Sequence, residues 1–213
     1  MKTDDLIAML STNIEAVDRR QMARTLAGAV ALGALIALGA GLIVLGGRTD
    51  VRVTAPLGFT VIKLTFAMTV TALAFFCLIG SARPSGRHRG SVAFVLLPFA
   101  GIIGLASIGL VNAPTTHWQM MLMGDEWLEC LVSVPVIAIV PFALVIWAVR
   151  QAAPTHLRRA GALAGLVSGG LSAAGYALHC TADSLPFVAI WYSGTIMLCT
   201  LAGAVLGPRL LRW

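Results

Sequence analysis

The chain has 213 residues, of which 58 % are hydrophobic and 11 % are charged, and its formal net charge is +6. A water-soluble domain needs more charge than this to cover its surface, so the composition excludes an ordinary soluble globule and favours a membrane protein. In a membrane protein the basic residues are better interpreted as signals of orientation than as a nucleic-acid surface, and we expect no direct binding to nucleic acid.

An N-terminal polar segment over residues 1–24 precedes the first apolar run. It contains four acids, and the run after it is too long for the core of a cleaved signal, so we expect this segment to be retained. Thr3 can cap a helix that has Asp4 and Asp5 in its first turn. Apolar residues then recur at helical spacing and form one stripe, which consists of Leu6, Ile7, Leu10, Ile14 and Val17.

This amphipathic stripe needs something to cover it. Residues 4–18 contain four acids and no Lys or Arg, whereas helices that bind membrane surfaces usually carry basic residues on their polar face. Three partners remain open on this pattern: a groove in another protein, loops of the same chain, or the lipid surface.

Six continuous apolar segments follow, each near the ~20 residues that cross a bilayer as a helix. They lie at about 25–47, 63–82, 91–113, 128–149, 160–178 and 187–207. Their continuity argues against the alternating pattern of a membrane β-barrel. The sequence therefore predicts an all-α bundle of six transmembrane helices over residues 25–213, embedded in a lipid bilayer.

The distribution of Lys and Arg predicts the orientation of this bundle. All 15 except Arg48, Arg52 and Lys63 lie in the N-terminal segment, the second and fourth loops, or the C-terminal tail. By the positive-inside rule both termini are cytoplasmic, and the third and fifth loops face outward. We expect Lys63 at an outer edge, where its side chain reaches water. No charge falls deep within a span, which argues against a channel or transporter.

Two of the four cysteines, Cys130 and Cys180, are candidates for a chemical role. Cys77 and Cys199 fall within spans, where a free thiol packs as a small apolar group. Cys130 opens the fourth span and Cys180 closes the fifth, so both are expected at similar depth on the outer face. In a bacterium the compartment on that side is oxidising, so disulfides persist there. Three interpretations stay open: a redox- or metal-sensing pair, a structural disulfide, or packing.

Potential metal ligands surround this pair in the sequence, namely His117, His179, Asp125, Glu126, Glu129 and Asp183. Thiolates and imidazoles suit a soft or borderline metal. No CxxC or HxxxH spacing defines a ligand set, so Cys130, Cys180 and His179 are the candidates for a transient metal ion, with His117 auxiliary. We expect no resident cofactor.

Small residues recur every four positions in the last two spans. Gly161, Gly165 and Gly169, continued by Ala173 and Ala177, form one ladder, and Gly203 with Gly207 repeats the spacing. Such ladders let helix backbones approach closely. Packing within the bundle is favoured here over a dimer interface.

Motifs of an enzyme are missing from the sequence. No Gly-rich phosphate loop, GxSxG or HExxH occurs. We expect a protein that is not an enzyme. The alternative is a membrane thiol-disulfide oxidoreductase that uses the same outward-facing cysteines, although such enzymes typically carry CxxC.

Several stretches together resemble the NrsF-type family of bacterial membrane anti-sigma factors. They are "MKTDDLIAML", "EWLEC", "RQAAPTHLRRAGALAGLVSGGLSAAGYALHC", "FVAIWYSGT" and the ending "LRW". The resemblance implies a six-span inner-membrane protein whose cytoplasmic N-terminal segment binds an extracytoplasmic-function sigma factor. It also implies that Cys130 and Cys180 face the periplasm and form the pair that senses stress, and that Asp4, Asp5, Leu6, Ile7 and Leu10 lie in the sigma-binding helix.

Overall fold

The structure is a computed structural model that describes residues 19–46, 54–81, 92–152 and 154–212. Every regular element in these ranges is a helix, so the predicted all-α fold is confirmed for them. The elements are α2 (Arg19–Ile43), α3 (Thr54–Ser81), η1 (Val92–Val95), α4 (Leu96–Val111), η2 (Thr115–His117), α5 (Trp118–Met123), α6 (Trp127–Gln151), α7 (Leu157–Ala177), α8 (Leu185–Phe187), η3 (Val188–Tyr192) and α9 (Ser193–Leu210).

The predicted N-terminal helix lies outside the described residues. This concerns all the residues assigned to partner binding, which are Asp4, Asp5, Leu6, Ile7, Leu10 and Ile14.

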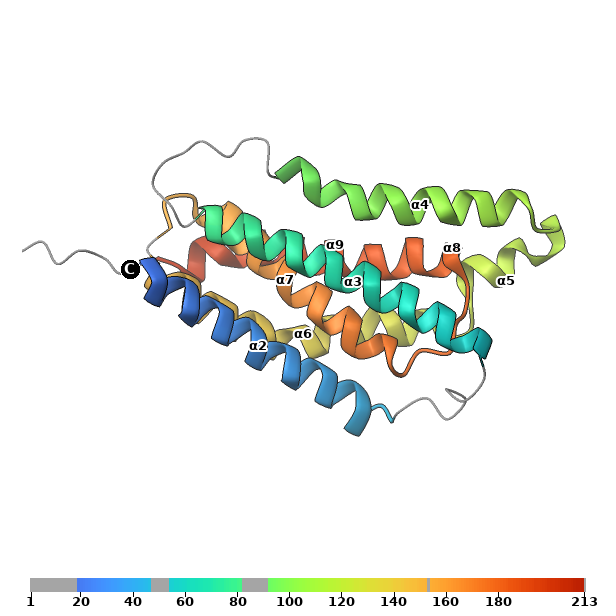
Figure 1. The fold of residues 1–213 in the computed structure, drawn as a ribbon, viewed down its shortest axis with the longest axis horizontal. Coiled ribbons are helices and arrows are strands. Elements are labelled where there is room, and N and C mark those ends of the chain that lie inside the picture. The colour runs from blue at the N-terminus through green and yellow to red at the C-terminus, as the bar shows by residue number, and fades with distance from the viewer. Residues whose placement is uncertain (1–18, 47–53, 82–91, 153, 213) are drawn as a thin grey trace, which may run out of the picture.

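Helix α7 forms the centre of the bundle. It packs against α2, α3, α6 and α9, and every residue from Leu163 to Ala177 is buried. Helix α4 lies at the margin of the molecule, beside α3 (Figure 1). An edge-to-face contact between Phe66 of α3 and Phe99 of α4, with ring centroids 5.5 Å apart, links α4 to the bundle.

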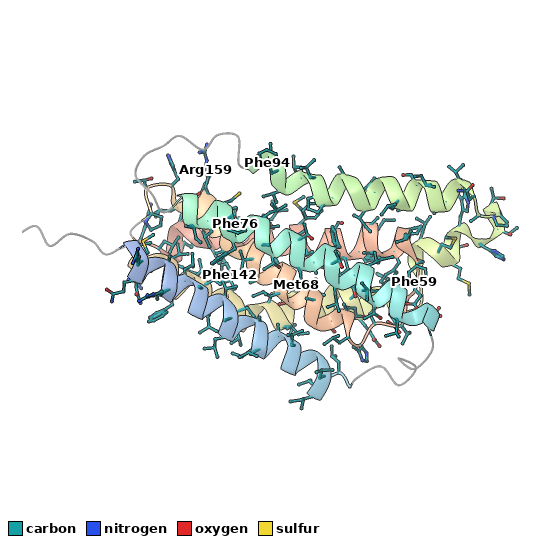
Figure 2. All side chains as sticks on the ribbon, in the orientation of Figure 1. Phe59, Met68, Phe76, Phe94, Phe142 and Arg159 are labelled. Atoms are coloured by element: carbon teal, nitrogen blue, oxygen red, sulfur yellow. The ribbon has the colours of Figure 1, made fainter. Side chains whose placement is uncertain are left out.

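The outer surface of the bundle is strongly apolar. Trp147 and Val205 are more than half exposed, as are Met68, Phe76 and Phe94 (Figure 2). A soluble protein rarely exposes apolar side chains over so much of its surface. Such a surface is compatible with contact to lipid.

Five helices are long and apolar enough to cross a membrane, where the sequence predicts six. The five segments are 20–43, 57–81, 93–111, 115–151 and 185–210. The predicted segment that is not among them corresponds to α7, which is rich in Gly, Ala and Ser. Because α7 faces other helices on all sides, close packing matters more there than bulky apolar side chains.

Glycines bring α7 and α9 into backbone contact. A Cβ atom on Gly161 would overlap the carbonyl oxygen of Gly203, and one on Gly207 would come within 2.8 Å of the Gly161 Cα atom. Gly165 faces the carbonyl oxygen of Cys199 in the same way. The predicted small-residue ladder therefore packs inside the bundle.

The two ends of the bundle carry opposite charge. The start of α2 and the end of α9 lie at one end (Figure 1). The described arginines belong to that end, by their places at helix termini: Arg20, Arg24, Arg150, Arg158, Arg159, Arg209 and Arg212. The described acids, Asp125, Glu126, Glu129 and Asp183, all lie at or near the opposite end, close to the start of α6 and in the loop after α7.

Candidate functional site

Cys130 and Cys180 meet at the acidic end of the bundle. Cys130 lies in the first turn of α6, and Cys180 lies in residues 178–184, which we call the cysteine loop, between α7 and α8. Both thiols have 0 % exposure. They are close enough that the charge of one acts on the other.

Lys63 also belongs to this site, which corrects the sequence-based expectation that it reaches water at an outer edge. It is fully buried. Its ammonium donates to the carbonyl oxygen of Cys180 at 3.0 Å and lies 3.6 Å from the Sγ atom of Cys180. It also pairs with Asp183 at 3.4 Å. Because a buried charge is costly without partners, these contacts explain how Lys63 can be accommodated.

The position of Lys63 follows from where α3 begins. The predicted span begins at residue 63, but the helix begins at Thr54, so Lys63 lies roughly two and a half turns inside it. From there the side chain extends toward the cysteine loop rather than toward solvent.

Opposing influences act on the Cys180 thiol. Burial raises the pKa of Cys180 above its ordinary value, the positive charge of Lys63 opposes that rise, and the carboxylate of Glu126 adds to it. The thiol is therefore mostly protonated near neutral pH, and Lys63 is the largest of the influences that favour its thiolate.

Two buried tyrosines lie beside the cysteines. Tyr176 comes from the end of α7 and Tyr192 from η3, with ring centroids 6.1 Å apart. Their hydroxyls are fully buried and make no hydrogen bond of ordinary geometry among the described residues. Tyr192 nevertheless interacts electrostatically with the Cys180 thiol.

A π-helical turn positions Tyr192. The segment η3 interrupts the α-helical pattern between α8 and α9, which frees backbone carbonyl groups. The Thr195 hydroxyl lies 2.8 Å from the carbonyl oxygen of Trp191 and 3.0 Å from that of Tyr192, so it can donate to either. Thr195 also interacts with Cys130. Turns of this kind often occur at functional sites.

The cysteine loop is fixed to neighbouring segments by hydrogen bonds. Glu126 accepts from the Thr181 backbone N–H at 2.9 Å and from the Thr181 hydroxyl. The Ser184 hydroxyl donates to the Met121 carbonyl oxygen at 2.6 Å, and it also caps α8 by accepting from Phe187. These contacts join the loop to α5 and to the residue before α6.

The two histidines do not complete a metal site with the cysteines. The Nδ1 atom of His179 lies 2.9 Å from the Gly46 carbonyl oxygen, and its Nε2 atom lies 3.8 Å from Glu129. His117 is exposed in η2. Among the described residues no group of three or more His, Cys, Asp or Glu side chains could bind a metal ion.

Comparison with known proteins identifies the family. The family model described as "Negative regulator of sigma F" matches residues 10–213. The chain belongs to the NrsF family. The resemblance noted from the sequence is thereby confirmed.

Two NrsF relatives match over their full length. The chain is 31 % identical over 213 residues to the "Probable anti-sigma-F factor NrsF" of Azospira oryzae, with all of both chains covered. It is 32 % identical over 224 residues to the "Anti-sigma-F factor NrsF" of Caulobacter vibrioides, again with both chains fully covered. No solved structure matches the chain.

The remaining two cysteines of this NrsF-family chain lie apart from the site. Cys77 is buried in α3 toward the arginine-rich end. Cys199 is buried in α9, where its Cβ atom lies against Gly169 of α7. Cys199 therefore has the packing position that its sequence context predicts.

Sequence reasoning missed Lys63, Glu126 as a loop anchor, and the two tyrosines. The one available signal was Lys63 itself, because a single lysine inside an apolar run is rare and usually has a partner. Tyr176 and Tyr192 gave no comparable signal, since aromatic residues are common near the ends of membrane helices.

Proposed function

We propose that this NrsF-family protein is a membrane-bound negative regulator that binds an extracytoplasmic-function sigma factor and releases it when Cys130 and Cys180 are oxidised. Family membership supports the regulatory role, and both relatives are named as anti-sigma-F factors. The observation that carries the sensing role is that these two buried thiols, from separate segments, lie close enough to influence each other.

The proposed membrane topology has six crossings. Five helices meet the length and composition of a span, and α7 is the sixth, shielded from lipid by the helices around it. The arginine-rich end is cytoplasmic by the positive-inside rule, which gives cytoplasmic termini. The acidic end, with Cys130 and Cys180, then faces the periplasm.

The N-terminal segment is the proposed tether for the sigma factor. It carries an apolar stripe with acidic flanks, a pattern suited to docking in a protein groove. It also leads directly into α2, which packs on α7 and α6. A change in the position of α2 would therefore alter how this segment is presented.

The chemical step is the formation of a disulfide. With hydrogen peroxide, the Cys180 thiolate attacks one oxygen, the O–O bond breaks, and the leaving hydroxide takes up a proton to form water. The Cys130 sulfur then loses its proton and attacks the Cys180 sulfenic acid, an S–S bond forms, and the S–O bond breaks with release of a second water. Two electrons pass from the thiols to the peroxide.

A route from this step to the cytoplasmic end runs through α7. Cys180 follows α7 directly, and α7 contacts α2 through Gly175 and Ala37. A disulfide typically contributes ~2–4 kcal/mol. A complete switch from 1:99 to 99:1 needs about 5.5 kcal/mol. One bond therefore supplies a large part of the free energy that the switch requires.

The experiment is co-purification of the bound sigma factor from membranes, with and without peroxide. Wild-type chain should retain the factor under reducing conditions and release it after oxidation, whereas Cys130→Ser/Cys180→Ser should retain it in both. The matched control is Cys77→Ser/Cys199→Ser, which removes two buried thiols elsewhere and should behave as wild type. A parallel arm with cadmium separates oxidation from capture of a soft ion.

Each outcome has a clear meaning. If no sigma factor co-purifies with any form, the proposed function is wrong. If the factor is retained but peroxide releases it equally from the double variant, the tether stands and the cysteine switch fails. Release by cadmium alone, from wild type only, makes the pair a metal sensor instead of a redox sensor.

A further inference from the structure

Lys63 is an unusual companion for a pair of thiols. It is a fully buried ammonium, and it comes from α3, a helix that contributes neither cysteine. Among the described residues its ammonium makes three polar contacts with the cysteine loop, to the Cys180 carbonyl oxygen, the Cys180 Sγ atom and Asp183. A lysine retained for packing alone would not need to bring a charge into this environment.

We propose that Lys63 is a positioning residue for the cysteine pair: it fixes the cysteine loop to α3 and supplies the positive charge that stabilises the Cys180 thiolate. This inference rests on the proposed sensing function. It makes Cys180 the attacking sulfur and Cys130 the resolving one, because the ammonium directly contacts Cys180.

Geometry supports both parts of the role. The hydrogen bond of 3.0 Å to the Cys180 carbonyl oxygen fixes the backbone at the reactive residue, so the sulfur has a defined place. The ion pair with Asp183 at 3.4 Å fixes the loop a second time, three residues further on. The 3.6 Å separation between Nζ and Sγ is within reach of a charge-assisted interaction once the thiol ionises.

The charge matters because the surroundings of the thiol otherwise oppose ionisation. The titratable and charged groups around Cys180 come from six segments: Lys63 from α3, Glu126 from the turn before α6, Cys130 from α6, Tyr176 from α7, His179 and Asp183 from the loop, and Tyr192 from η3. Lys63 is the cation in this set that acts on the Cys180 thiol, because the His179 ring faces Gly46 and Glu129 instead. Nucleophilic attack requires the thiolate, so the rate of reaction depends on that cation.

The resident ammonium also bears on which reagents the site takes. A divalent metal bound by both sulfurs would have to share the space beside Sγ with a positive charge, which is unfavourable. Small neutral oxidants meet no such repulsion from the ammonium. The site is therefore arranged for a small two-electron oxidant such as a peroxide.

The test measures the reactivity of Cys180 in the full chain in membranes. Cys77, Cys130 and Cys199 are replaced by Ser, so that Cys180 is the single thiol, and its alkylation by iodoacetamide is followed by mass spectrometry across pH. Lys63→Met should slow alkylation near neutral pH about tenfold or more, because loss of the opposite charge raises the pKa of Cys180 and so lowers the fraction of thiolate. Lys63→Arg retains the charge and should stay closer to the parent chain.

Further variants guard against a failure to fold. Lys63→Met deprives Asp183 of its Lys63 partner, so Lys63→Met/Asp183→Asn is measured alongside and should show the same slow alkylation. Asp183→Asn alone keeps Lys63 and removes a competing negative charge, so alkylation should become faster at each pH below the plateau. Folding is checked by size-exclusion chromatography in detergent.

Three results would overturn the proposal. They are an unchanged pH profile in Lys63→Met or in the double variant, a Lys63→Arg chain as slow as Lys63→Met, and slower alkylation in Asp183→Asn. None of these depends on a sigma factor. If the same membranes fail to retain a sigma factor, the proposed function is wrong. The role of Lys63 is still decided by the alkylation rates alone.

Discussion

Gly41 of α2 and Gly175 of α7 touch through their backbones. A Cβ atom on Gly41 would overlap the Gly175 carbonyl oxygen, and a Cβ atom on Gly175 would overlap the Ala37 carbonyl oxygen. The contact joins the helix that leads into the cysteine loop to the helix that follows the N-terminal segment. It is therefore a physical connection between the candidate site and the proposed tether.

The first prediction is that Gly175→Val separates these helices. No flexible side chain can yield there, because the atoms in the way belong to the backbone. Overpacking of this kind costs about 1–3 kcal/mol. We expect a lower melting temperature, measured by thermal unfolding in detergent, and loss of peroxide-dependent release of the sigma factor.

Gly39 offers the matched control in α2. A Cβ atom there meets nothing within 4 Å. Gly39→Ala should therefore keep both the melting temperature and the release. If Gly175→Val melts and releases like the parent chain, the α2–α7 contact is not the route by which the site acts on the N-terminal segment.

The helices could be predicted from the sequence because each apolar run is continuous and bounded by polar residues. The small-residue ladder also predicted a close contact, and α7 and α9 make it. The status of α7 was harder to predict. Its buried position lets Gly and Ala replace larger apolar residues, so its composition alone does not mark it as a span.

The cysteine pair could be predicted from the sequence, but the residues that surround it could not. Cys130 and Cys180 are both adjacent to helix ends that topology brings to one side. The contacts of Lys63 with Cys180 and of Glu126 with Thr181 join residues far apart in the chain, and no local pattern specifies them. The π-helical turn at Tyr192 likewise depends on packing rather than on a sequence motif.

A second prediction concerns alkaline solution. The pKa of Cys180 is raised by burial, so the folded chain binds this proton more tightly than the unfolded chain does. The resulting stabilisation is fully present below the unfolded pKa of about 8.5 and is lost as pH rises toward the folded value. We expect the melting temperature to fall from about pH 8.5 upward, and to fall more steeply than in Cys180→Ser.

The comparison is made with Cys77 and Cys199 replaced by Ser in both chains. The two chains then differ only at residue 180. Parallel curves of melting temperature against pH would show that the Cys180 proton contributes nothing to stability.

A third prediction separates the two tyrosines. Both hydroxyls are buried without a hydrogen bond of ordinary geometry, so removing either leaves no partner unsatisfied. Tyr192→Phe and Tyr176→Phe should each keep the stability of the parent within about 1 kcal/mol. Only Tyr192→Phe should slow alkylation of Cys180, because the Tyr192 hydroxyl favours the thiolate. Equal rates of Cys180 alkylation in the two variants would show that the Tyr192 hydroxyl has no specific effect on the thiol.

The last prediction addresses the tether. Deleting residues 1–18 leaves the chain from Arg19 onward, where α2 begins, so the bundle and the cysteine site should keep their melting temperature and alkylation rate. Retention of the sigma factor should be lost. Within the full chain, Leu10→Glu places a charge on the apolar stripe and should weaken retention, whereas Ser11→Glu lies off the stripe and should not. Quantitative co-purification from membranes measures all three.

If the truncated chain still retains the factor, another cytoplasmic surface must bind it. If the full chain never binds one while its cysteines turn over with an oxidant, the protein is a thiol-disulfide oxidoreductase instead.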